Sequence, residues 1–286
     1  MNFNSENSKI KEWSIVVLKS IIFAVIGGAL VAFVHMICGR YVLHIHGKPE
    51  FLSNSLIVFS AFDKFLVAVT YYILGRKIPI KNSILRGLAF VAFNWISNFL
   101  PQFMGLAFAD GPVAEVAFRF SDLVCDSIVY VILGVVLGVL YKNDSYTEKR
   151  ECNKKVFAKT VATSAVLFPV LVIIFDQTMR FIKPEFSSLY AIGVSESLMT
   201  QFYINFYSWF ILSGAAIAVF YRMSEFNDSK SGMKFGLMYS LLLWTPVVMI
   251  MVVFGMELLA TSVYACVFIM IIMFVCWMDS RLIEKE

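Results

Sequence analysis

The chain has 286 residues, of which 59% are hydrophobic and only 15% are charged. Soluble globular domains are about 45–50% apolar and about 25% charged, so we expect this chain to sit in a lipid bilayer. The formal net charge of +4 includes no basic tract long enough to indicate nucleic-acid binding. The five cysteines are scattered without a CxxC pair. Their odd number argues against a disulfide framework, and we expect them to be small buried apolar side chains.

Eight apolar stretches are long enough to cross a membrane, which takes about 20 mostly apolar residues per helix. In chain order they are residues 14–38, 53–75, 85–108, 120–141, 159–182, 199–221, 235–254 and 258–279. The first stretch is too long for the apolar region of a signal peptide, so we expect it to be retained. The predicted fold class is therefore an all-α integral membrane protein with eight transmembrane helices.

The distribution of lysine and arginine predicts the orientation of these helices. The two chain ends and the segments 76–86, 142–159 and 222–234 contain most of the 24 lysines and arginines, whereas the alternate segments contain few. The positive-inside rule places the basic segments in the cytoplasm. We therefore expect a multi-pass protein of the cell membrane with both termini cytoplasmic.

The two halves of the chain resemble each other. Residues 18–41 align without gaps to residues 158–181, with a lysine and an arginine matched near the two ends. Each half would begin and end in the cytoplasm, so the repeats would be parallel and related by an axis along the membrane normal. The alignment favours one membrane domain built as a tandem 4+4 repeat, with halves 1–145 and 146–286.

Asp63 and Lys64 are adjacent charges inside the second apolar stretch. A charge near the centre of a transmembrane helix costs about 2.5–3.5 kcal/mol on insertion scales. Both side chains must therefore face protein or water. Neighbours on a helix point about 100° apart, so we expect them to pair poorly with each other. By depth in the membrane, Asp126 and Asp176 are the predicted partners of Lys64.

Other polar residues fall in the same outer half of the predicted bundle. Two of them, Asp122 and Asp126, are spaced i,i+4 and so share one helix face. Two interpretations stay open: an outward-facing polar cavity that binds a solute or ion, or buried ion pairs that hold helices together. The candidate binding residues are Asp63, Lys64, Asp122, Asp126, Asp176, His35 and Asn94.

Motifs of known chemistry are missing from the sequence. It contains no HExxH, GxSxG or GxxxxGK[ST] pattern. The two histidines of the first outer loop have no third metal ligand nearby. We therefore expect no enzymatic activity, no metal and no cofactor. Gly134-x-x-x-Gly138 and the Gly27-Gly28 pair are typical of close helix–helix packing.

The architecture and the intramembrane charges favour a secondary transporter or permease-like protein for a small polar or amphiphilic solute. One alternative is a non-transporting membrane protein, such as an immunity factor, a sensor or the membrane subunit of a complex. A second is an intramembrane enzyme that modifies lipid. The expected partners are the lipid bilayer, a small-molecule or ion ligand, and a protein partner or second copy of the chain. We expect no nucleic acid.

Overall fold

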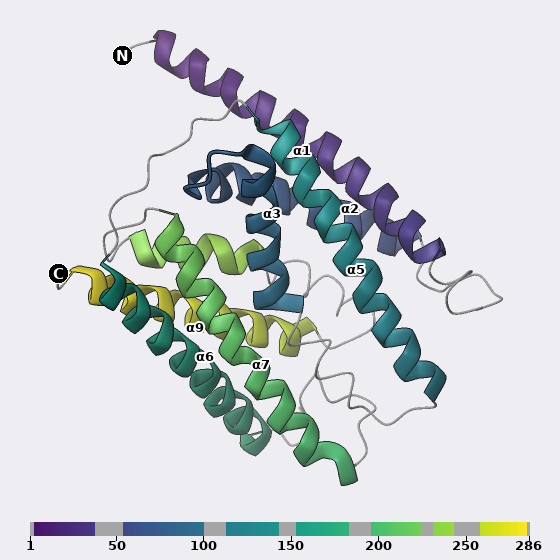
Figure 1. Cartoon of the computed structure of the whole chain (residues 1–286), viewed down its shortest axis with the longest axis vertical. Coiled ribbons are helices and arrows are strands. Elements are labelled where there is room, and N and C mark those ends of the chain that lie inside the picture. Colours follow the sequence, from purple (N-terminus) through teal and green to yellow (C-terminus); the bar gives the residue numbers. More distant parts are fainter. Residues whose placement is uncertain are drawn as a thin grey trace.

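A computed structural model describes residues 3–37, 54–99, 113–142, 153–182, 196–224, 231–242 and 258–284 of the chain. These residues form eight α-helices and contain no β-strand, which confirms the all-helical class (Figure 1). In chain order the elements are α1 (Phe3–Ile37), α2 (Asn54–Ile73), the 3-10 turn η3 (Gly75–Lys77), α3 (Ser83–Asn94), the π-helical turn η4 (Trp95–Phe99), α5 (Val113–Leu140), α6 (Lys154–Ile182), α7 (Glu196–Met223), the helical segment 231–242 and α9 (Leu258–Glu284). Each predicted apolar stretch overlaps one of these helices.

Three of the described helices are long and apolar enough to cross a membrane. These spans are Ile10–Val34, Lys154–Met179 and Ser262–Glu284. The helical segments Ser83–Ser97 and Val124–Leu140 are apolar but shorter. Large apolar side chains such as Val25, Val166 and Met270 are exposed on the three long spans. Extended apolar faces of this kind are suited to contact with lipid.

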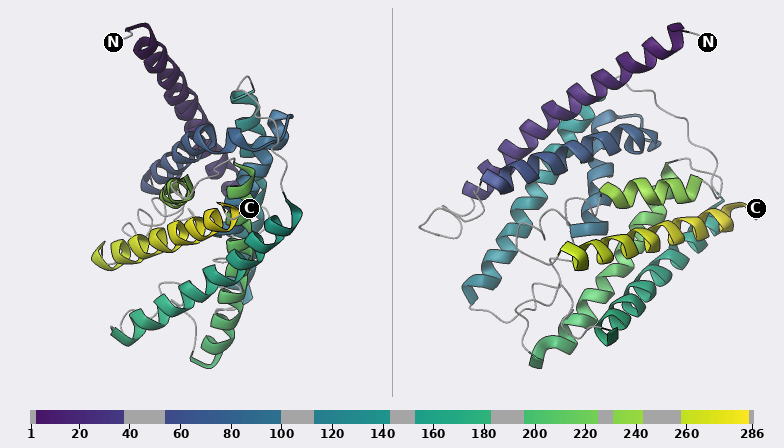
Figure 2. Two further views of the ribbon diagram at one scale, coloured as in Figure 1. Left: turned by 90° about the vertical axis from the view of Figure 1, so that its left-hand side faces the viewer. Right: turned by 180° about the vertical axis from the view of Figure 1, so that it is seen from behind.

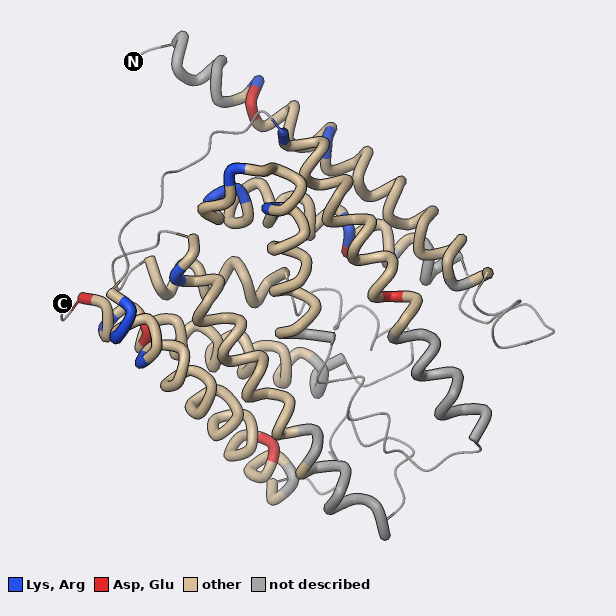
Figure 3. The backbone as a smooth tube through the Cα atoms, in the orientation of Figure 1, with Lys and Arg blue, Asp and Glu red and all other residues tan. Residues whose placement is uncertain are grey.

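The helices gather in two groups that meet at α3. α1 packs against α2 and α5, and α6 packs against α7 and α9, whereas α3 contacts both α5 and α7 (Figures 1 and 2). The two chain ends lie on the same side of the molecule. Figure 3 shows that most of the described lysines and arginines lie toward that side.

Glycines allow the closest helix crossings. A Cβ atom on Gly87 of α3 would lie 2.1 Å from the carbonyl oxygen of Gly134 and 2.9 Å from the amide nitrogen of Gly138. The GxxxG segment of α5 therefore meets the backbone of α3, as the sequence predicts. On Gly214 of α7, a Cβ atom would lie 2.2 Å from the carbonyl oxygen of Ser164 on α6. A side chain at either glycine would separate the helices.

Aromatic side chains join the two groups of helices. The rings of Phe93 on α3 and Phe220 on α7 stack with their centroids 5.3 Å apart. Phe90, Phe235 and Tyr239 each contact the Phe220 ring edge-on at 5.2–5.6 Å. Such pairs contribute about 0.5–1.5 kcal/mol each beyond the burial of their surface. This cluster holds α3 and the segment 231–242 against α7.

Candidate functional site

Lys64 is buried in the middle of α2, where only 6% of the residue is exposed. Its ammonium forms a salt bridge with the carboxylate of Asp63, whose side chain is 15% exposed. The same ammonium lies 5.1 Å from the centroid of the Tyr130 ring on α5, which is within the range of a cation–π contact. The positive charge is thus held by one carboxylate and one aromatic face.

The expectation that Asp63 and Lys64 would pair poorly is wrong. Their Cα–Cβ bonds diverge, but the flexible four-carbon stem of lysine lets the ammonium fold back to the neighbouring carboxylate. The salt bridge therefore lies within α2 instead of reaching an aspartate on another helix. Because the two charges cancel inside one helix, the pair carries no net charge into the apolar bundle.

Gly27 of α1 provides the space for the lysine stem. A Cβ atom on Gly27 would lie 2.7 Å from Cγ and 3.0 Å from Cβ of Lys64, and 3.4 Å from Cδ2 of Leu133 on α5. Any larger residue would displace the lysine. Three helices therefore meet at this point: α1 supplies the space, α2 the charges and α5 the aromatic ring.

Asp126 lies one turn before Tyr130 on α5 and is half-buried. The carboxylates of Asp63 and Asp126 both interact electrostatically with the Tyr130 phenol. We call Asp63, Lys64, Asp126 and Tyr130 the charged cluster. It combines two carboxylates, one ammonium and one phenol. A buried group of this kind can exchange a proton, hold a small cation or bind the polar end of a solute.

Two other candidate residues lie elsewhere. Asp176 is buried on α6 and accepts a hydrogen bond from the Tyr207 hydroxyl on α7. Asn94 is buried at the end of α3, directly before the π-helical turn. The structure thus brings Asp63 and Asp126 together around Tyr130, whereas Asp176 links a different pair of helices. The side chains of His35 and Asp122 lie outside the described residues, although their backbones belong to α1 and α5.

Cys125 corrects another expectation. This residue, next to Asp126, is buried and takes part in a disulfide whose partner lies outside the described residues. Cys266 and Cys276 are free thiols. An odd number of cysteines leaves at least one unpaired but does not exclude a single bond. The interpretation of every cysteine as a small apolar side chain is therefore wrong at Cys125.

Sequence reasoning missed a second buried polar group. The Ser164 hydroxyl on α6 lies 2.7 and 2.8 Å from the two carboxylate oxygens of Asp279 on α9, and both residues are fully buried. Arg222 of α7 interacts electrostatically with the same carboxylate. The sequence did contain a signal for this group. Arg222 and Asp279 carry opposite charges and lie at the ends of the sixth and eighth apolar stretches, at the same predicted membrane face.

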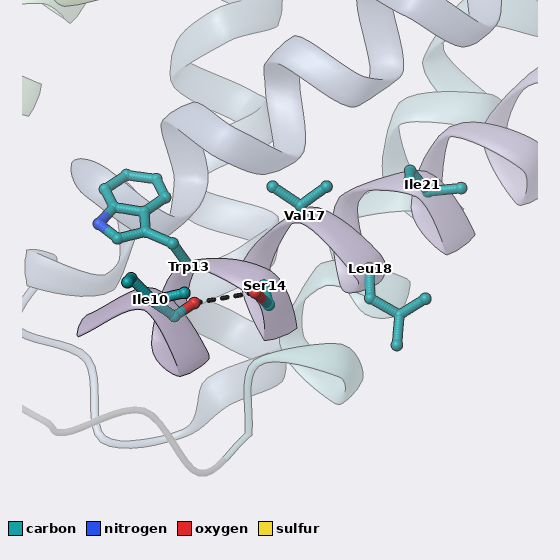
Figure 4. Close-up of a pocket in the computed structure, with 6 residues that line it drawn as sticks. All are labelled: Ile10, Trp13, Ser14, Val17, Leu18 and Ile21. Atoms are coloured by element: carbon teal, nitrogen blue, oxygen red, sulfur yellow. Dashed lines mark hydrogen bonds between the residues drawn. The ribbon is translucent and has the colours of Figure 1, made fainter. Parts of the chain in front are cut away.

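A hollow of about 730 Å³ lies along one side of α1 (Figure 4). Its lining is Ile10, Trp13, Ser14, Val17, Leu18 and Ile21. The polar groups among them are the Trp13 indole N–H and the Ser14 hydroxyl, which donates to the Ile10 carbonyl oxygen at 2.9 Å. The Ser14 hydroxyl is thus bonded within its own helix, and the lining is mainly apolar, so the hollow is suited to apolar contact.

Comparison with known proteins adds no functional assignment. The chain matches no protein-family model, and neither a curated protein nor a solved structure matches it. The features of the chain that bear on its function are therefore its apolar helices and the charged cluster.

Proposed function

We propose that this protein crosses the membrane eight times and acts as a secondary transporter or permease-like protein for a small polar or amphiphilic solute. The observation that carries the proposal is the buried Asp63–Lys64 pair, set in an apolar helix beside Tyr130. Ionisable residues inside membrane helices are costly and commonly mark the path of a solute or ion.

The charged cluster can work by exchange of partners. A proton or a cationic solute group that binds Asp63 competes with the Lys64 ammonium for the same carboxylate. The released ammonium then becomes available to an anionic group of the solute. Asp126 also interacts electrostatically with the Tyr130 phenol, so the cluster joins charged groups of α2 and α5.

The proposed orientation and repeat have structural support. Most of the described basic residues lie toward the side that holds both chain ends (Figure 3), which the positive-inside rule assigns to the cytoplasm. The contacts of α1 with α2 and α5 correspond to those of α6 with α7 and α9. Gly87 meets the α5 backbone, and a Cβ atom on Gly236 of the segment 231–242 would lie 2.8 Å from Cα of Met273 on α9. These parallels favour two parallel four-helix halves.

Solid-supported membrane electrophysiology tests this function, because it detects charge movement when a solute binds or is translocated. The probes are Na⁺, K⁺, a pH step, and panels of amino acids, amines and organic anions. We expect at least one probe to give a current with wild-type proteoliposomes. The double variant Asp63→Asn, Lys64→Met should abolish it, whereas Lys142→Gln at the exposed end of α5 should retain it. Silence with every probe, or an unchanged current in the double variant, contradicts the proposal.

A second candidate is a non-transporting membrane subunit or sensor. The hydrogen bonds between Tyr207 and Asp176 and between Ser164 and Asp279 favour it, because each joins two helices. Polar groups used in this way hold a bundle together without binding a solute. A subunit should co-purify with a defined partner after crosslinking in native membranes, and it should give no solute-dependent current.

A further inference from the structure

Arg86 is one of the largest fully buried side chains among the described residues, with 1% of its surface exposed. It lies near the start of α3, where the chain has just passed through the turn η3. Arginine keeps its positive charge in proteins. A buried charge is strongly destabilising unless it is paired or fully hydrogen-bonded. The partners of this guanidinium therefore decide what it does.

The guanidinium of Arg86 has little to neutralise it. Its Nη1 donates to the backbone oxygen of Arg76 at 3.2 Å, and its Nε has no hydrogen-bond partner. No carboxylate among the described residues forms a salt bridge with it. The neighbouring Arg76 differs, because its guanidinium lies 3.9 Å from the Glu12 carboxylate and 4.0 Å from the Tyr72 ring centroid.

Other basic residues lie in the same connection as Arg86. Lys77 and Lys81 belong to the same connection between α2 and α3, and Figure 3 shows several basic residues gathered there. The first turn of α3 is already capped, since the Asn82 side chain accepts from the amides of Ile84 at 2.9 Å and Leu85 at 3.2 Å. These two amides are therefore already used, whereas the buried Nε of Arg86 has no hydrogen-bond partner.

We propose that Arg86 is the centre of an anion site that binds a phosphate group. The planar guanidinium presents two parallel N–H groups that match two phosphate oxygens, which an ammonium cannot do. Under the proposed topology this connection faces the cytoplasm, where anionic lipid headgroups supply such a group. Free inorganic phosphate has the same oxygens and is the second source.

Access to the guanidinium requires movement of η3. This turn is a single 3-10 turn, held by bonds from the Lys77 amide to the Leu74 carbonyl and from the Ile78 amide to the Gly75 carbonyl, both 3.1 Å long. Leu74 and Ile78 beside the turn are fully buried, so opening exposes apolar surface, and the bonds between the anion and the guanidinium must offset that cost. The anion would replace the Arg76 carbonyl oxygen on the guanidinium, so binding and opening of η3 are coupled.

Thermal unfolding of the purified protein, followed by tryptophan fluorescence, tests the site. One arm compares inorganic phosphate with chloride at equal ionic strength in neutral detergent. The other compares nanodiscs of phosphatidylcholine with nanodiscs that also contain phosphatidylglycerol. In the first arm, we expect the wild-type melting temperature to rise with the logarithm of the phosphate concentration once that concentration exceeds the dissociation constant. In the second arm, we expect a higher melting temperature in the nanodiscs that contain phosphatidylglycerol. A response in both arms identifies the phosphate group itself, and a response in nanodiscs alone identifies lipid as the source.

Two arginine variants separate the site from general charge effects. Arg86→Lys keeps the charge but loses the paired donors, so it should lose most of the shift. Arg281→Lys is the control, because that exposed guanidinium pairs with Glu284 at 3.0 Å and should keep the shift. Equal shifts in wild type and Arg86→Lys overturn the inference.

Hydrogen exchange in the wild-type protein decides the question even if Arg86→Lys does not fold. Anion binding should change the exchange rates of the amides of residues 75–78, because it moves η3. No melting shift in either arm, or unchanged exchange at these amides under saturating phosphate and in anionic nanodiscs, overturns the inference.

Discussion

Replacing Gly27 with alanine is the sharpest test of how the charged cluster is packed. The new Cβ atom would lie 2.7 Å from Cγ of Lys64, closer than two carbon atoms can approach, and the lysine stem would have to move. Adding a methyl group to a packed site costs about 1–3 kcal/mol. The loss would be larger if the ammonium left Asp63, since breaking one side of a buried pair costs about 3–5 kcal/mol.

The adjacent Gly28 is the matched control. A Cβ atom there would have its nearest neighbour, Cβ of Ala61, at 3.4 Å, which is an ordinary contact. Both glycines are buried in α1, and alanine stabilises a helix interior by about 0.5–1 kcal/mol relative to glycine. We therefore expect Gly28→Ala to be neutral or slightly stabilising. The helix-propensity gain is common to both variants, so they should differ in unfolding free energy by the packing cost alone, about 1–3 kcal/mol.

Reversible unfolding in mixed detergent micelles measures this difference. The assay is repeated in a Lys64→Ala background, where the Cγ atom that meets the new methyl group is missing. The cost of Gly27→Ala should fall there, because the 2.7 Å contact no longer exists. Equal stability of the Gly27→Ala and Gly28→Ala variants would refute the packing argument. An unchanged cost in the Lys64→Ala background would place the clash elsewhere.

Two further predictions use the same unfolding assay. Lys64→Met should cost about 3–5 kcal/mol, because it leaves the Asp63 carboxylate buried without its ammonium. Adding Asp63→Asn should recover part of that loss. The control Lys142→Gln, at an exposed position, should change the unfolding free energy by no more than about 0.5 kcal/mol. A double variant no more stable than Lys64→Met would contradict the ion-pair argument. Ser164→Ala should cost about 1–3 kcal/mol by leaving a buried carboxylate with one donor fewer. Ser14→Ala, which removes a bond within one exposed helix turn, should be nearly neutral, and similar losses in both serine variants would contradict this reasoning.

The helices were predictable because apolar runs bounded by polar segments are a strong signal. The expected stretch 53–75 corresponds closely to α2 (Asn54–Ile73). The ends were less predictable: α1 begins at Phe3 and not near residue 14. Its first turns are polar, and residues such as Glu6 and Lys9 favour a helix without contributing to an apolar run. A search for membrane spans therefore underestimates the length of this helix.

The candidate site was located by its charges, but its pairing could not be read from the sequence. Whether Lys64 reaches Asp63 depends on the rotamer of a long side chain and on the space that Gly27 leaves on another helix. Neither is encoded in a local pattern. The burial of Asp279 was not predicted for a different reason. An aspartate near the end of an apolar run is expected to face solvent, whereas in the structure it is buried against Ser164. Burial at such a position is set by the neighbouring helices.

Cysteine labelling at two exposed helix ends tests the proposed orientation of the helices in the membrane. Lys142 follows α5 and should lie in the cytoplasm, whereas Phe181, 89% exposed near the end of α6, should lie outside. A membrane-impermeant maleimide should label Phe181→Cys in intact cells and Lys142→Cys only after permeabilisation, with wild type as the background. The disulfide at Cys125 favours the same orientation. Cys125 lies in the outer half of the predicted span 120–141, and disulfides form outside the reducing cytoplasm. The opposite labelling would put the basic segments outside and Cys125 nearer the reducing face, and it would refute the orientation.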